Sequence, residues 1–163
     1  MRPTATVAMM ASEISYTITV SNNRTEKAAI DYLLEKDARF WAPNPTARKA
    51  ILAEMGVSPA LARAFDLLIV EDPIVGESGF ATANVNSITL VELKTTRKRL
   101  PTLPDGFFFG ATQNEFDLAA QLGDRYRFCF VSLHPESMGY CLLTLAELEP
   151  RIRTKRTQYQ INL

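Results

Sequence analysis

Two charged side chains, Glu92 and Lys94, interrupt an otherwise apolar stretch with the sequence ITLVELKTT at positions 88–96. Side chains alternate between the two faces of a strand, so both charges share the face that carries Ile88 and Leu90. Burying a charge is costly unless an opposite charge or a metal ion compensates for the lost water. The stretch therefore predicts a central strand whose end carries a chemically active group.

A second carboxylate, Asp66, belongs to the apolar stretch FDLLIV, which predicts the preceding strand. If the two strands pair antiparallel with Val70 opposite Ile88, the residue opposite Asp66 is Glu92. Their Cβ atoms would lie roughly 4.5–5.5 Å apart, and like charges at that distance destabilise a sheet. A divalent cation compensates such a pair, and Mg²⁺ prefers a few carboxylates with water and phosphate oxygens. We therefore favour a metal site over a plain surface ion pair at the strand end.

Glu26 is a third acidic candidate. It shares the apolar face of a helix predicted over residues 23–36, together with Ala29 and Leu33. A helix packed against the sheet would bring this carboxylate toward the other two. The sequence Asn23-x-x-Glu26 also has the form of a capping box, which would occupy the same side chain at the helix start. Both interpretations stay open.

The other predicted elements must hold these residues in place. Their order indicates an α/β fold with a central mixed sheet flanked by helices. Helices are predicted over residues 44–56, 58–64 and 112–123, strands over 125–133, 139–144 and 157–163, a loop over 95–110, and a short strand in the segment after Val70. With 163 residues, 47% of them hydrophobic, the chain suits one globular domain over residues 1–163. Residues 1–20 are expected to be a mobile or strand-like terminus.

Composition narrows the class of protein. Eighteen basic and eighteen acidic residues give no net charge, which argues neither for nor against nucleic acid. No apolar run is long enough to span a bilayer, and residues 1–15 lack the apolar core of a signal peptide, so we expect a cytoplasmic protein without a membrane partner. Cys129 and Cys141 are predicted to be free, buried thiols. One histidine and no CxxC motif make a zinc site improbable.

Asp66, followed by Glu92-Leu93-Lys94 at the end of the next long strand, resembles the motif of the PD-(D/E)XK nuclease superfamily of restriction-endonuclease-like enzymes. An acidic residue in the first helix recurs in that superfamily, and Glu26 has the matching place. The resemblance covers about residues 23–133 in the order of elements. No proline precedes Asp66, where the superfamily often has one. The stretch FFFGATQNEFDLAAQLGDRYRFCFV also resembles restriction-associated nuclease domains with an Asn-Glu helix.

The resemblance implies a restriction-endonuclease-like fold and a Mg²⁺-dependent endonuclease that hydrolyses phosphodiester bonds of DNA in restriction or phage defence. Asp66 and Glu92, with the carbonyl of Leu93, would hold one or two Mg²⁺ ions, for which Mn²⁺ substitutes. Lys94 would orient or activate the attacking water. Gln113 resembles an auxiliary glutamine that contacts the water or the phosphate. Glu115 is predicted to form a capping box with the residue three positions before it.

Basic side chains next to the motif are candidate DNA contacts. Arg97, Lys98 and Arg99 follow the predicted strand directly, and clustered Lys and Arg are typical of phosphate contacts. A second basic run, at 151–156, is a weaker candidate because it is distant in sequence. The aromatic residues in 106–109 are expected to be a plug that returns the loop to the core, with stacking on bases as the alternative.

Other functions are compatible with the same residues. A repair or recombination nuclease with structure-specific action would use the same site. A catalytically inactive nuclease fold that binds nucleic acid or a protein has less reason to keep costly inward charges, and a purely structural module leaves them unexplained. Double-strand cleavage by so small a chain favours a homodimer with one site per strand, and a subunit of a larger assembly would equally explain the size.

Overall fold

The structure, a computed structural model, describes residues 23–71 and 85–163. The predictions for residues 1–20 and for a short strand after Val70 lie outside these described residues. Within the described ranges, no helix combines the length and apolar character that crossing a membrane requires.

Five strands form one sheet in the order β1-β2-β3-β4-β5. Their bounds are Phe40–Trp41, Leu67–Val70, Ile88–Thr96, Tyr126–Ser132 and Gly139–Leu143. The β3 and β4 strands run parallel, and the other three pairs are antiparallel. The prediction of an α/β fold with a mixed sheet flanked by helices is therefore confirmed.

The register of β2 against β3 agrees with the one expected from the apolar pattern. Val70 lies opposite Ile88, and Leu67 lies opposite Val91. Asp66 stands one residue before β2, and its N–H donates to the carbonyl of Val91 at 2.8 Å. Asp66 thus reaches the level of the β3 residues that carry the motif.

Helices α2 (Pro45–Glu54) and α3 (Gln113–Leu122) begin where their capping residues predict. The other helices are one over residues 23–36 and the short α4 (Leu145–Leu148), with single 3₁₀ turns at Pro59–Leu61, Val85–Ser87, Gly123–Arg125 and Glu149–Arg151. The Asn44 side chain caps α2 by accepting the N–H of Ala47 at 2.8 Å. Gly123 ends α3 with a φ of 56°, a conformation that other residues rarely adopt.

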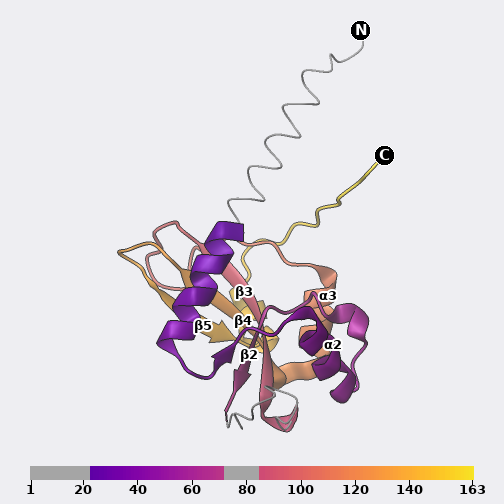
Figure 1. Cartoon of the computed structure of the whole chain (residues 1–163). Helices are drawn as coiled ribbons and strands as arrows, with labels where there is room; N and C mark the ends of the chain where they lie inside the picture. The colour runs from indigo at the N-terminus through magenta and orange to yellow at the C-terminus, as the bar shows by residue number, and fades with distance from the viewer. Residues whose placement is uncertain (1–22, 72–84) are drawn as a thin grey trace.

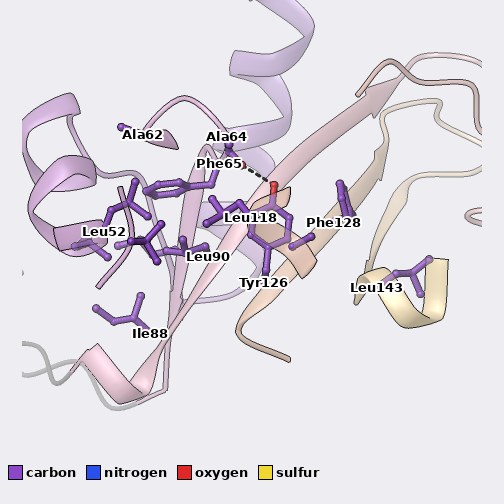
Figure 2. Packing of buried hydrophobic residues seen from close by; sticks show 14 of the residues in the cluster. Leu52, Ala62, Ala64, Phe65, Ile88, Leu90, Leu118, Tyr126, Phe128 and Leu143 are labelled. Carbon is purple, nitrogen blue, oxygen red and sulfur yellow. Dashed lines mark hydrogen bonds between the residues drawn. The ribbon is translucent and has the colours of Figure 1, made fainter. Parts of the chain in front are cut away.

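The sheet is buried on both faces, because helices cover each of them (Figure 1). Alternate residues of the strands face α2, α3 and α4, where Leu90 packs with Leu52, Phe65, Leu118 and Tyr126 (Figure 2). The opposite face packs against the helix over residues 23–36, through residues that include Ala29, Leu33, Leu67, Ile69, Val91 and Leu93. Alternation therefore directs Glu92 and Lys94 toward the α3 side and Leu93 toward the first helix.

Three elements differ from the predictions. The predicted helix over residues 58–64 is wrong, because only a single 3₁₀ turn at Pro59–Leu61 forms there. Phe40 and Trp41, in a stretch for which the sequence predicted no helix or strand, form strand β1 against β2. The predicted strand over residues 157–163 is wrong: this segment has no regular structure and its residues are exposed. An alternating sequence forms a strand only where another strand supplies hydrogen bonds, and this segment pairs with none in the described part of the chain. Cys129 and Cys141 are free, as predicted, although only Cys129 is fully buried.

Candidate functional site

Asp66 is joined to the motif through the backbone of β3. Its Oδ2 accepts the N–H of Leu93 at 2.9 Å, at the point where β2 has not yet begun and leaves that donor without a strand partner. In a paired strand, the N–H and the C=O of one residue are directed to the same side. The carbonyl oxygen of Leu93 is therefore directed to the side on which the Asp66 carboxylate lies.

Lys94 lies between two carboxylates. Its Nζ donates to Glu92 Oε1 at 2.9 Å and to Glu115 Oε2 at 2.8 Å. All three residues are buried, with exposed fractions of 6% for Glu92, 8% for Lys94 and 6% for Glu115. The ammonium also lies 6.0 Å from the centre of the Phe109 ring, within the range of a cation–π contact. We refer to Asp66, Glu92, Lys94 and Glu115 as the charge cluster.

The charge cluster carries more negative than positive charge, and Glu92 shows the consequence. Burial, the charge of Asp66 and that of Glu115 together outweigh Lys94 and raise the pKa of Glu92 to about 9. Its second oxygen, Oε2, is buried and has no hydrogen-bond partner among the described residues. The cluster therefore favours the protonated form of Glu92, and a further cation beside Oε2 would compensate the charge of the carboxylate in the same way as the proton.

Lys94 keeps its positive charge. Burial alone would lower the pKa of Lys94, but the charge of Glu92 and the hydrogen bonds and charge of Glu115 outweigh it, and the pKa is raised. An ammonium group has no free lone pair and donates hydrogen bonds only. In this arrangement Lys94 can orient a water or a phosphate oxygen and neutralise negative charge, but it cannot remove a proton.

Glu26 approaches the cluster from the other face of the sheet. Its helix packs on the face that carries Leu93, and the Glu26 side chain stays exposed. Partial burial of the carboxyl group and the charge of Asp66 raise the pKa of Glu26, whereas the charges of Arg48 and Lys94 act in the opposite direction. Glu26 therefore lies at the edge of the charge cluster, close enough to interact electrostatically with Asp66 and Lys94.

Arg48 supports the backbone that presents Asp66, a role that sequence analysis missed. Its Nη1 donates to the carbonyl of Phe65 at 3.1 Å and its Nη2 to the carbonyl of Asp66 at 3.3 Å. The guanidinium also lies over the Phe65 ring, 5.8 Å from its centre. A signal was present in the sequence: Arg48 precedes the buried Ile51 and Leu52 by three and four residues, so it shares their face of α2.

The predicted capping box at α3 is wrong in its second half. Thr112 does cap the helix, because its Oγ1 accepts the N–H of Glu115 at 3.3 Å. The Glu115 carboxylate, however, turns inward to Lys94 and does not return to the cap. Glu115, Leu118 and Ala119 are the buried residues of α3, and their spacing of three and four residues marks one helix face. That spacing is the signal that would have identified Glu115.

Gln113 does not join the charge cluster. Its side chain is exposed, and its amide donates to Asp117 Oδ1 on the same helix at 2.8 Å. Because Gln113 and Glu115 are two positions apart, they point to different sides of α3. The predicted auxiliary role of Gln113 has no contact in this structure to support it.

Arg97, Lys98 and Arg99 are exposed where β3 ends. Arg97 Nε donates to Thr25 Oγ1 at 3.1 Å, and Arg99 forms an ion pair of 3.4 Å with a surface glutamate. No ion pair holds Lys98 in the described part of the chain. Thr25 adjoins Glu26 in the sequence, so this basic run lies beside the rim of the site.

The residues present suit a hard divalent cation. In residues 23–71 and 85–163, no three His, Cys, Asp or Glu side chains are drawn together as a ready metal cage. Mg²⁺ needs fewer protein ligands than that, since it is bound through one or two carboxylates together with water and phosphate oxygens. The oxygen atoms that could serve as such ligands are those of the Asp66 carboxylate, the unpartnered Oε2 of Glu92 and the Leu93 carbonyl.

Comparison of the chain with protein-family models, with curated proteins and with solved structures finds no match. The functional assignment therefore depends on the geometry and electrostatics of the charge cluster.

Proposed function

We propose that this chain is a Mg²⁺-dependent endonuclease that hydrolyses phosphodiester bonds of DNA on a restriction-endonuclease-like fold, and that it acts in restriction or phage defence. The observation that carries the proposal is the buried, unpartnered Oε2 of Glu92 beside the carboxylate of Asp66. The charge of Asp66 raises the cost of ionising Glu92, and a proton or a second cation beside Oε2 would compensate it. Binding of a divalent cation would account for the unpartnered Oε2 of Glu92, which a purely structural role leaves unexplained.

In this proposal Asp66, Glu92 and the Leu93 carbonyl hold the ion, and the hydrogen bond from Leu93 N–H fixes the Asp66 carboxylate. Once bound, the cation supplies Lewis-acid activation of water and charge neutralisation at the phosphate. Lys94, a permanent ammonium, orients the attacking water and stabilises negative charge that develops on the phosphate oxygens. Glu115 holds the Lys94 side chain on the α3 side.

Cleavage is expected to depend on the metal. Supercoiled plasmid incubated with the protein and Mg²⁺ should be converted to nicked or linear DNA, and EDTA should abolish the conversion. Mn²⁺ should restore it, because it accepts the same oxygen ligands. The product also reports assembly, since a homodimer with two sites would yield linear DNA and a single site would yield nicks. Conversion that persists undiminished in EDTA would contradict the metal assignment.

DNA binding is expected to weaken steeply with salt, because the exposed Arg97, Lys98 and Arg99 are assigned to phosphates. The Lys98→Ala variant should lower the slope of log K against log salt concentration by about one and weaken binding alike for all sequences. Fluorescence anisotropy of labelled DNA over a salt series measures both quantities. Lys27→Ala, which removes an exposed lysine paired with Asp31, is the matched control. A slope that is unchanged in Lys98→Ala would remove that residue from the interface.

A further inference from the structure

One aromatic side chain near the charge cluster is held in solvent. Phe108 is 90% exposed, whereas its neighbours Phe107 and Phe109 are partly buried. Both neighbours pack edge-on against Phe130 of β4, with ring centres 5.1 and 5.0 Å away. Scattered exposed apolar residues are normal in proteins. This one differs because anchored rings on each side hold its backbone in place and direct it outward.

Phe108 is also the direct neighbour of a residue that contacts the charge cluster. The adjacent Phe109 has its ring centre 6.0 Å from Lys94 Nζ. Consecutive Cα atoms are 3.8 Å apart, so Phe108 starts one residue step from the ring that covers the lysine. Phe108 therefore belongs to the same short segment of the loop as the ring that lies over Lys94.

The loop that carries Phe108 has basic residues on both sides. The exposed Arg97, Lys98 and Arg99 stand at its start, and the basic segment over residues 151–156 begins beside Asp105 of the loop. Arg151 lies 4.0 Å from Asp105 of the loop, and Lys155 lies over the Phe116 ring of α3 at 4.9 Å. Positive charge around an exposed aromatic ring is the combination that binds single-stranded nucleic acid, through phosphate contacts and base stacking.

We propose that Phe108 stacks on an unpaired base of a DNA strand next to the phosphodiester that the site cleaves, so that the preferred substrate has single-stranded or distorted DNA at the cut. This inference rests on the proposed nuclease function and specifies its substrate class. An unpaired base offers its face without prior unstacking, whereas insertion into an intact duplex requires base pairs to be unstacked first. A preference for unpaired DNA favours a nuclease with structure-specific action.

The test measures binding in EDTA, so that it does not depend on cleavage. Phe108→Ala should weaken the affinity for a labelled single-stranded oligonucleotide by roughly five- to a hundredfold, the effect expected for one stacked base. Its affinity for a blunt duplex should change by less than about twofold. Phe108→Trp should retain the wild-type preference, because the larger ring stacks at least as well. The indole fluorescence of that variant should be quenched by the single strand and not by the duplex.

Leu34→Ala is the control, since it removes an exposed apolar side chain from the helix over residues 23–36 and should leave both affinities unchanged. An equal loss for duplex and single strand in Phe108→Ala would refute the preference for unpaired bases. No loss for either DNA would remove Phe108 from the interface. If binding behaves as expected but Mg²⁺-dependent cleavage is never observed, the stacking surface stands and the nuclease function fails.

Discussion

Lys94→Ala is expected to lower Mg²⁺-dependent plasmid cleavage by at least about a hundredfold, the loss typical when one electrostatic group at a reacting centre is removed. Lys94 donates to two buried carboxylates, and its raised pKa keeps it an ammonium over the whole working range. No alternative cation contacts Glu92 among the described residues. The measurement is the initial rate of supercoil loss at saturating Mg²⁺, with Lys27→Ala as the control for an exposed lysine.

The same substitution leaves the buried Glu92 and Glu115 without their ion-pair partner. A loss of activity must therefore be distinguished from a loss of folding stability. Removing one member of a buried ion pair costs roughly 3–5 kcal/mol of unfolding free energy. The double variant Lys94→Met with Glu115→Gln removes the positive charge and one negative charge together and keeps the aliphatic stem. It should recover most of the stability and still fail to cleave DNA. Cleavage at the wild-type rate in this well-folded double variant would overturn the role given to Lys94.

The register of the motif could be predicted because two independent patterns agree. Both β2 and β3 are apolar on each face, and only the pairing of Val70 with Ile88 brings Asp66 level with Glu92. A slip of one residue would have reversed the faces of a whole strand. Long-range geometry is accessible from sequence in such a case, because the apolar pattern itself encodes which residues meet.

Glu115 and Arg48 were not predicted because their partners are distant in sequence. The apolar residues of α3 do not by themselves reveal its buried face, because Glu115 is buried whereas Ala120 is exposed. Sequence periodicity defines the buried face of a helix only to within about one residue. That uncertainty is enough to decide whether Glu115 caps the helix or turns inward to pair with Lys94. Strand β1 was missed for a related reason, since two residues are too few to show a period.

Glu26 and Gln113 show the limit of transferring roles by element order. Both lie on the expected helices, yet the first is at the rim and the second is turned to solvent. The helix that carries Glu26 packs on the sheet face opposite to the one that carries Glu92, so its carboxylate reaches the cluster only around the strand end. Element order predicts which helix is near a site, and packing decides which side chain enters it.

Glu92→Gln is expected to abolish cleavage and yet stabilise the metal-free protein. Burial and the Asp66 charge raise the pKa of Glu92 from 4.5 to about 9 in the folded state. The folded protein therefore holds a proton that the unfolded chain releases near pH 4.5. The contribution of this proton to the unfolding free energy is complete below pH 4.5 and is lost progressively as the pH rises to about 9. A glutamine resembles the protonated carboxyl group and keeps an oxygen for Lys94, so the variant avoids this loss.

The measurement is the unfolding free energy by denaturant titration from about pH 5 to about pH 9 in EDTA. The difference between Glu92→Gln and the wild type should grow with pH in favour of the variant, whereas Glu54→Gln, an exposed position on α2, should give a flat difference. Mg²⁺ should then stabilise the wild type, increasingly at higher pH as the competing proton leaves, and should not stabilise Glu92→Gln. A variant that is less stable than the wild type at high pH, or equally stabilised by Mg²⁺, would show that Glu92 neither carries the extra proton nor binds the ion. Misfolding would lower both the cleavage activity and the unfolding free energy. A variant that loses activity while its unfolding free energy rises therefore identifies Glu92 as a metal ligand and not as a structural residue.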